Sequence, residues 1–406
     1  MTDVETKTQP RSARVVLKLA LLVLFALAVL FLRRPDQFLH PYIWVEGGGF
    51  TLPAYVARGW ATLFEPLAGY LLVTSKLLDL LGFQISILYA PQIAATLAML
   101  FTCAVVVAIA FSPTYLRAPI LCAAAVLLVP SDPEVFGVAS YAFWWAGILL
   151  FLAVLWERDH QWLRHAYIVI GGLSSPIIGP AVALLGLRFV VQRNRQEFLA
   201  LCMGGAMALA QFFAMRSQYR IMGSAYEIKF QPPLVLAEKF IGGFFHAYST
   251  PYVGVAVLIA LLAAGLIVWR KLNAPFYLLV AMFVIVSTSI AFRVHDGFEM
   301  LDPFRGGPRY FFYPFILLSW IMIWLAVVSP LPLRVVFAGA FACAIMLAGT
   351  GLSRRHDAVD WKQQILACAN SEKYELPIQY IGKVSDMWHL TLTGAQCRDL
   401  IARSWF

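Results

Sequence analysis

Long runs of apolar residues, separated by short polar segments, dominate the chain from residue 15 to residue 350. A helix needs about 20 predominantly apolar residues to cross the hydrocarbon core of a membrane. By this rule the pattern predicts eleven membrane spans. They lie near residues 15–32, 86–111, 118–130, 138–156, 166–176, 177–192, 198–215, 252–269, 275–292, 312–328 and 332–350.

Two of these spans, 166–176 and 177–192, are short and are separated by the sequence SSPIIGP. Proline and glycine interrupt a helix and leave backbone groups without hydrogen-bond partners. At membrane depth such groups must be shielded by protein or water. We therefore predict a helical hairpin that turns within or near the far leaflet.

The segment between the first two spans, residues 33–85, is amphipathic rather than uniformly apolar. Within it, Leu52 to Phe64 and Leu67 to Leu81 are two apolar stretches broken by charges. Such stretches are typical of interfacial helices that lie on a membrane surface. The charged residues concerned are Arg58, Glu65, Lys76 and Asp79.

Composition supports the same class of protein. Of the 406 residues, 61% are hydrophobic and 13% are charged, and the mean hydropathy is +0.75. A soluble protein of this length needs more polar surface, so we expect an all-α polytopic membrane protein. The first helix, Leu17 to Leu32, is not followed by a small-residue cleavage site and is expected to remain in the protein. The net charge of +9 points to lipid headgroups or phosphate-bearing ligands, not to nucleic acid.

Basic residues in short loops set the predicted orientation. Cytoplasmic loops carry an excess of Lys and Arg. We therefore place the N-terminus in the cytoplasm and, after eleven spans, the C-terminus on the opposite side. The basic residues assigned to the cytoplasmic side are Lys7, Arg11, Arg14, Lys18, Arg117, Arg158, Arg164, Arg188, Arg193, Arg195, Arg270 and Lys271.

This orientation divides the chain into a transmembrane domain, residues 1–350, and a polar tail, residues 351–406, outside the cytoplasm. The tail has no long apolar run and is too small to be very stable unaided, so we expect it to be a cap on the larger domain. Outside the cytoplasm, its two cysteines, Cys368 and Cys397, are expected to form a disulfide.

Glu46 is the first candidate for chemistry, because it lies in the sequence HPYIWVEGGGF directly after the first span. A carboxylate at the mouth of a membrane cavity can act as a general base, and the glycines admit a substrate close to the backbone. The alternative is a solvated loop acid. Trp44 offers a flat face either for a sugar ring or for anchoring at the membrane interface.

Two further acids lie at membrane boundaries. Asp36 is a candidate second base or orienting partner, ranked below Glu46 because Arg33 and Arg34 would hold it ionised and occupied. Glu134, in the sequence VPSDPEVF, begins a span and could point into a cavity, as intramembrane acids usually do.

The segment 293–311 carries Arg305 and Arg309 around a Gly-Gly-Pro sequence, with Tyr310 at the start of a span. These arginines could contact lipid phosphates, or they could bind a phosphate leaving group bidentately. The acids and histidine of the same loop are a weak candidate metal cluster, because their spacing is irregular. Its members are His295, Asp296, Glu299 and Asp302.

In order along the chain, these motifs resemble the GT-C superfamily of membrane glycosyltransferases, in particular bacterial proteins that modify surface polysaccharide or O-antigen. The first loop of that pattern has Arg-Pro, Pro, Trp-Ala-Glu-Asp-Gly and a Tyr-Ala-Gly-Tyr-like stretch, and the chain departs from it at Gly47, where an Asp is expected. The matching residues are Arg34-Pro35, Pro41, Trp44-Val45-Glu46-Gly47, Leu67-Ala68-Gly69-Tyr70, Pro130 with Glu134, Ser175-Pro176, and Arg309-Tyr310-Phe311 with Pro314.

The resemblance implies transfer of a sugar, with inversion, from a polyprenyl-phosphate carrier to a glycan or lipid acceptor at the periplasmic face of the bacterial inner membrane. It implies Glu46 as general base with Asp36 in reserve. Because one acid of the family's pair is missing, a divalent metal is possible but not favoured. Residues expected to bind substrate are Arg34, Trp44, Tyr70, Glu134, Arg305, Arg309 and Tyr310.

Three other functions remain open: a transporter or flippase for lipid-linked glycans, a polysaccharide polymerase or ligase, and a non-catalytic assembly protein. A transporter is expected to show internal repeats and charges in the middle of its spans, whereas this chain shows no internal repeat and nearly all its charge lies at loop boundaries. A polymerase or ligase would use external arginines without requiring Glu46. The chain also lacks a Gly-rich phosphate loop, a CxxC pair, HExxH and GxSxG, so nucleotide hydrolysis is not expected.

Overall fold

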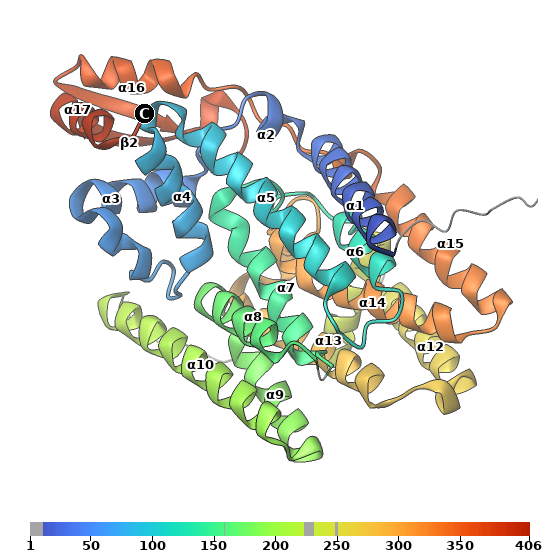
Figure 1. Cartoon of the computed structure of the whole chain (residues 1–406). Helices are drawn as coiled ribbons and strands as arrows, with labels where there is room; N and C mark the ends of the chain where they lie inside the picture. Colours follow the sequence, from blue (N-terminus) through green and yellow to red (C-terminus); the bar gives the residue numbers. More distant parts are fainter. Residues whose placement is uncertain (1–10, 158, 223–230, 248–250) are drawn as a thin grey trace, which may run out of the picture.

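The computed structural model describes residues 11–157, 159–222, 231–247 and 251–406 (Figure 1). Helices make up 75% of it. The α-helices are α1 (Arg11–Arg33), α2 (Pro35–Leu39), α3 (Leu52–Arg58), α4 (Val73–Ile85), α5 (Ala90–Phe111), α6 (Pro119–Leu127), α7 (Ala142–Val154), α8 (Gln161–Ser174), α9 (Ile178–Gln192), α10 (Arg195–Met222), α11 (Pro233–Ala237), α12 (Pro251–Ile267), α13 (Ala274–Arg293), α14 (Phe312–Val328), α15 (Leu331–Ala348), α16 (Trp361–Ala369) and α17 (Gly394–Arg403).

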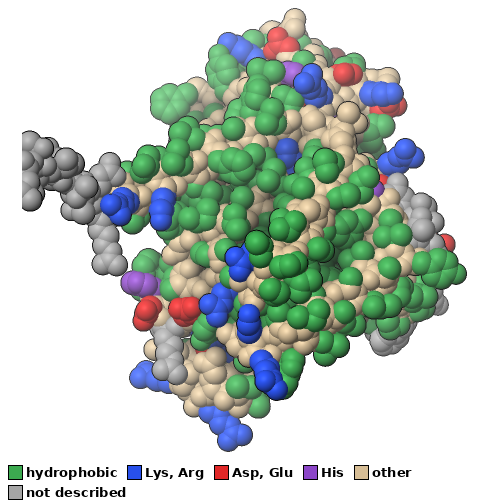
Figure 2. Space-filling model, turned by 90° about the vertical axis from the view of Figure 1, so that its right-hand side faces the viewer, with side chains coloured by type: hydrophobic (Ala, Val, Ile, Leu, Met, Phe, Trp, Pro, Cys, Tyr) green, Lys and Arg blue, Asp and Glu red, His purple; other side chains and the backbone are tan. Residues whose placement is uncertain are grey.

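Six helical segments in the described part of the chain are long and apolar enough to cross a membrane, so the chain is a helical membrane protein, but eleven spans are not confirmed. Shorter apolar helices at Ala139–Val154, Ile178–Gln192 and Tyr252–Ile267 match three more predicted spans, while α6 and α8 belong to neither group. Hydrophobic side chains cover most of the face shown in Figure 2, and acidic side chains lie near its margins. The six long segments are Ala13–Arg33, Ile87–Phe111, Arg195–Ser217, Ala274–Arg293, Pro308–Val328 and Leu331–Leu352.

The loops expected in the cytoplasm do meet at one end of the bundle. Backbone bonds from Tyr115 to Leu155 (2.9 Å) and from Glu157 to Pro113 (2.8 Å) join two of them. The Lys271 ammonium donates to the carbonyl of Val328 at 3.1 Å and joins a third to the end of α14. These basic loops therefore share one side of the protein.

Two of the arginines assigned to the cytoplasmic side have a structural role and do not lie at the lipid surface. Arg164 and Arg188 are buried, and both pair with the carboxylate of Glu197, at 2.7 and 2.6 Å. This triad ties α8, α9 and α10 together at the basic end. Arg158 and Lys7 lie outside the described residues.

The predicted hairpin is formed by α8 and α9, which are separated by residues 175–177. The predicted interfacial position of the second amphipathic segment is wrong. Helix α4 begins at Val73, packs against α5, α7 and α8, and buries Lys76 and Asp79, which are 4% and 3% exposed. Tertiary packing therefore covers charges that the sequence pattern assigned to the headgroups. The first segment does keep exposed apolar side chains, Trp60 and Phe64.

The tail forms a small cap that contains β-structure as well as helices, which the all-α prediction did not include. Strands β1 (Lys373–Ile378) and β2 (Trp388–Thr393) pair antiparallel between α16 and α17. A disulfide joins Cys368 of α16 to Cys397 of α17, the pair that the sequence singled out. The cap lies beside the C-terminal end of α1, where the Arg354 N–H donates to the carbonyl of Arg33 at 2.9 Å (Figure 1).

The cap is bound to the first loop by backbone contacts. The Gln379 N–H donates to the Ile43 carbonyl at 3.2 Å, and Trp44 and Gln379 form a parallel bridge. At the other edge, the Trp361 indole N–H donates to the carbonyl of Ile87 at 2.7 Å. The cap, the first loop and the start of α5 therefore form one unit at the end of the bundle opposite the basic loops.

Candidate active site

A cavity of about 550 Å³ lies at the capped end of the bundle, where α7, α9 and α14 begin and α8 and α13 end. Its walls are mostly apolar side chains, many of them from α9, α10 and α13, and its charged groups come from the first loop, the end of α13 and the segment before α14. Concave apolar pockets with a few converging polar groups are the usual form of ligand sites. Polar and aromatic residues that line it include Glu46, Tyr70, Ser140, Arg293, Arg309 and Tyr310.

Glu46 begins a π-helical turn, Glu46–Thr51, and lines the cavity. Its Oε1 accepts a hydrogen bond from the Tyr141 hydroxyl at 3.1 Å, while its Oε2 is buried without a hydrogen-bond partner. Burial raises the pKa of this carboxyl, although the nearby Arg309 guanidinium and the Tyr141 hydroxyl act in the opposite direction. A carboxylate with one buried oxygen left unpaired can accept a proton from a bound hydroxyl.

Arg309 reaches the same cavity and is held by an acid. Its guanidinium lies 2.6 Å from Oε1 of Glu134, and its backbone N–H donates to Oε2 at 3.2 Å. Glu134 thus pairs with the cation from behind and is not among the residues that line the cavity. Tyr310 places its ring 5.3 Å from the Arg309 guanidinium carbon.

Tyr141 connects the two acids, and no sequence motif marks it as a functional residue. Its phenol oxygen lies 3.1 Å from Oε1 of both Glu46 and Glu134, and it accepts hydrogen bonds from Trp44 (3.0 Å) and Arg309 (3.1 Å). A phenol has a single proton to donate. Because Arg309 already satisfies Glu134, that proton is available to Glu46.

Trp44 supports the site from behind instead of offering a face to a ligand. It is 5% exposed, does not line the cavity, and lies against His356 of the cap with ring centroids 5.4 Å apart. Tyr42 also stacks with His356, with ring centroids 4.9 Å apart. Burial and the Arg34 and Arg354 charges lower the pKa of His356 to about 3, so this ring is neutral beside its two aromatic neighbours. The expected roles of Trp44 as sugar platform or interfacial anchor are therefore wrong.

Asp36 and Arg34 form a buried ion pair, 3.1 Å between their side chains, and neither residue lines the cavity. Burial alone would raise the pKa of Asp36, but the Arg34 guanidinium holds it below its ordinary value. Arg34 also donates to the carbonyls of Pro133 and Phe136, both at 3.1 Å, and so fixes the turn that carries Glu134. The pair is structural, and neither member has the position expected of a base or a substrate ligand.

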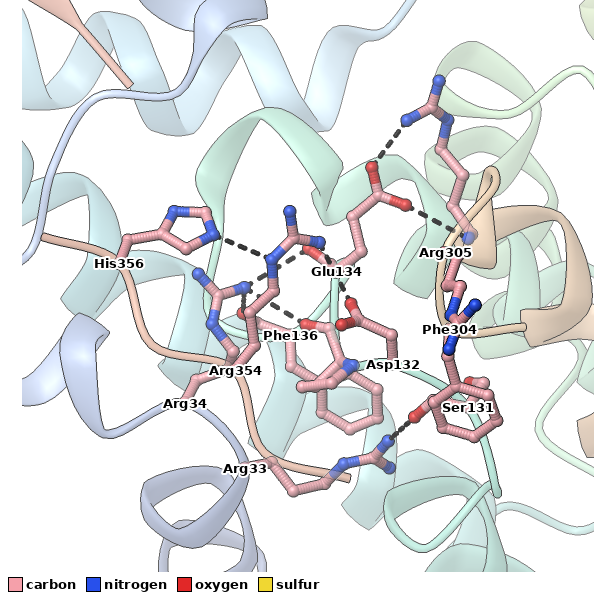
Figure 3. A network of polar contacts seen from close by, with 12 residues as sticks. Arg33, Arg34, Ser131, Asp132, Glu134, Phe136, Phe304, Arg305, Arg354 and His356 are labelled. Carbon is pink, nitrogen blue, oxygen red and sulfur yellow. Dashed lines mark hydrogen bonds and ion pairs between the residues drawn. The ribbon is translucent and has the colours of Figure 1, made fainter. Parts of the chain in front are cut away.

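The cap contributes to the same polar network. Arg354 pairs with Asp132 at 3.0 Å and donates to the ring nitrogen of His356 at 2.7 Å (Figure 3). Arg33 donates to the carbonyls of Leu127 (2.8 Å) and Leu352 (3.2 Å). The turn before α7 is therefore held from both the first loop and the cap.

Arg305 does not reach the cavity. Its side chain is exposed, and its backbone N–H donates to Asp302 at 3.0 Å, which shapes the loop. Arg293, at the end of α13, lines the cavity instead, with its guanidinium carbon 5.5 Å from the centroid of Tyr70. Its position at the end of a predicted span, where the segment 293–311 begins, was the sequence feature that could have identified it.

The described residues of the segment 295–302 do not form the suggested metal cluster. Within those residues, no group of three His, Cys, Asp or Glu side chains is close enough to hold a metal ion. The side chains of His295 and Asp296 lie outside the description.

Comparisons of the chain with protein-family models, with curated proteins and with solved structures found no match. The case for function therefore depends on the geometry of the cavity.

Proposed function

We propose that this protein is an inverting membrane glycosyltransferase that moves a sugar from a polyprenyl-phosphate carrier to a glycan or lipid acceptor. The observation that carries the proposal is the unpaired, buried Oε2 of Glu46 in a cavity that also contains Arg293 and Arg309. A base and cations facing one apolar space match the needs of a reaction that removes a hydroxyl proton and releases a phosphate.

In the proposed reaction, the acceptor hydroxyl oxygen attacks the anomeric carbon of the sugar from the face opposite the phosphate. The bond between the anomeric carbon and the phosphate oxygen breaks, and its electron pair leaves with the polyprenyl phosphate. Glu46 takes the hydroxyl proton. Arg309, held in place by Glu134, and Arg293 stabilise the charge that develops on the phosphate.

The apolar walls suit a lipid-linked donor better than a free nucleotide sugar. Ile178 of α9, Phe212 of α10 and Ile290 of α13 line the cavity on the side away from Glu46's loop. Only 22% of the apolar stretch of α10 is buried inside the protein, so much of the surface of this helix is available to lipid. An isoprenoid chain can lie against such a wall while its phosphate meets the arginines.

The proposal places the cavity and cap on the periplasmic side of the bacterial inner membrane. The basic loops meet at the other end of the bundle, which the positive-inside rule assigns to the cytoplasm. The disulfide between Cys368 and Cys397 agrees with an oxidising compartment for the cap.

The test is Glu46→Gln, which keeps the shape of the side chain but removes the base. Mass spectrometry of surface glycans and lipids from a deletion strain first identifies the missing modification. Complementation with Glu46→Gln is then expected to leave that modification absent, with normal membrane levels of the protein. The matched control is Glu375→Gln, an exposed cap residue, which is expected to restore it.

Restoration of the modification by Glu46→Gln would overturn the base assignment and favour a flippase or a polymerase, since neither requires this acid.

A further inference from the structure

Asp79 of α4 is a buried carboxylate beside Glu46 that the proposed reaction does not yet use. A Cβ placed on Gly47 would lie 3.1 and 3.2 Å from the two Asp79 carboxylate oxygens and 2.9 Å from Oγ of Ser140. A side chain at position 47 would crowd the Asp79 carboxylate, so this position needs glycine. A second carboxylate, supplied by α4, therefore lies against the loop that carries Glu46.

In the described part of the chain, Asp79 is buried with a single hydrogen-bond donor beside it. It is 3% exposed, and its hydrogen bond comes from the Ser140 hydroxyl at 3.0 Å. Among the described residues, no ion pair includes it. Lys76, one turn earlier, donates instead to the carbonyls of Thr62 and Glu65.

A buried carboxylate without a cation is costly to ionise and favours its protonated form. The charges that act on Asp79 are those of Glu46, from the first loop, and Lys76, on its own helix. Burial raises the pKa of Asp79 to about 7, the Ser140 hydrogen bond opposes this, the Glu46 charge adds to the increase and Lys76 opposes it. Glu46 has the Arg309 guanidinium and the Tyr141 hydroxyl to stabilise its charge, so of the two carboxyls Asp79 is the one that favours the protonated form.

Ser140 connects Asp79 to the cavity, because its side chain both contacts the Asp79 carboxyl and lines the space beside Glu46. We propose that Asp79 is a positioning residue that works in its protonated form, so that Glu46 and Asp79 together carry a single negative charge. A second negative charge at this place would repel the phosphate of the donor. The catalytic part of this inference rests on the proposed function.

The first test does not depend on any substrate. Infrared difference spectroscopy of the purified full chain in lipid nanodiscs, titrated through pH 7, resolves the C=O stretch of a protonated carboxyl from ionised carboxylate bands. The wild-type protein is expected to lose such a band as the pH rises through about 7. The band is expected to persist in Glu46→Gln, shifted to lower pH because the neighbouring charge is gone, and to be missing in Asp79→Asn.

The matched control is Asp386→Asn, an exposed carboxylate of the cap, which is expected to leave the band unchanged. A band that is equally strong in Asp79→Asn, or no such band in the wild type, overturns the shared-charge assignment.

The second test uses sugar transfer. Asp79→Asn imitates the protonated acid, whereas Asp79→Ala removes the partner of Ser140, so the asparagine variant is expected to retain at least tenfold more activity. The wild-type kcat/KM for the donor is expected to fall above pH 7, and Asp79→Asn is expected to abolish this fall. Equal losses in both variants with an unchanged pH profile would mean that Asp79 has only a packing role.

The two tests separate the two proposals. If no variant and no wild-type protein transfers sugar, the infrared result still decides whether the carboxylates share one charge. If Glu46→Gln abolishes transfer but Asp79 shows no protonated band, the proposed function stands and the role of Asp79 falls.

Discussion

The guanidinium of Arg309 lies 2.6 Å from the carboxylate of Glu134, a residue 175 positions earlier in the chain. This ion pair determines how the cation is presented to the cavity, because Glu134 approaches from behind the lining and leaves Arg309 on its surface. The pair also joins the turn before α7 to the start of α14. An arginine oriented in this way is ready for an anionic ligand before that ligand arrives.

Replacing Arg309 by alanine is expected to weaken use of the lipid donor by about 100-fold, the usual loss when one charged stabiliser of a developing anion is removed. The measurement is kcat/KM for the polyprenyl-phosphate sugar in reconstituted vesicles. Arg305→Ala is the matched control, because this exposed side chain lies outside the cavity, and it is expected to change kcat/KM little. Equal losses in both variants would contradict the phosphate role of Arg309.

Replacing Tyr141 by phenylalanine removes the hydroxyl that donates to Glu46 and is expected to lower the rate by about tenfold, equivalent to about 1.4 kcal/mol. That hydroxyl lowers the pKa of Glu46, so its loss raises this pKa further. Because Glu46 must be ionised to accept a proton, activity falls as the pH drops through its pKa. The acid limb of the pH–rate profile is therefore expected to move to higher pH in Tyr141→Phe. An unchanged acid limb would mean that this limb does not report the ionisation of Glu46.

Replacing Gly47 by alanine is expected to destabilise the protein by about 1–3 kcal/mol, the usual cost of overpacking. The new Cβ would lie 2.9 Å from Oγ of Ser140 and 3.1 Å from the nearer oxygen of Asp79. Thermal unfolding in detergent measures the change. Gly339→Ala in α15 is the control, because nothing lies within 4 Å of its added Cβ, and it is expected to leave the unfolding temperature the same or slightly higher.

Replacing Cys368 and Cys397 by serine is expected to destabilise the cap by about 3 kcal/mol through loss of a loop closure of some thirty residues. Limited proteolysis measures this as faster cleavage within residues 351–406. The wild-type pair also reports orientation, since it is expected to resist alkylation in intact cells until a reductant is added. Free alkylation without a reductant would place the cap in the cytoplasm.

The sequence predicted well what depends on neighbouring residues. The apolar runs located the helices, the SSPIIGP segment located the break between α8 and α9, and the proximity of Arg34 explained why Asp36 is occupied. Each of these depends on interactions over a few positions. Local patterns are sufficient for them.

The candidate site depends instead on contacts between distant segments. Tyr141 lies 95 residues from Glu46, and nothing in its own neighbourhood marks it as the link between two acids. Asp79 was expected to face the membrane surface because a charge in an amphipathic stretch usually does. Its burial depends on α5, α7 and α8 packing around α4, which no pattern within α4 reveals.

The parallel bridge between Trp44 and Gln379 has a consequence for biogenesis. The first loop is synthesised long before the cap, yet the loop that presents Glu46 is supported by Ile378 against Gly48 and by the Gln379 N–H on Ile43. A nascent chain that has inserted its helices but lacks its final segment therefore lacks these supports of the Glu46 loop. Activity of the proposed enzyme is therefore expected to begin only after the cap has docked on the first loop.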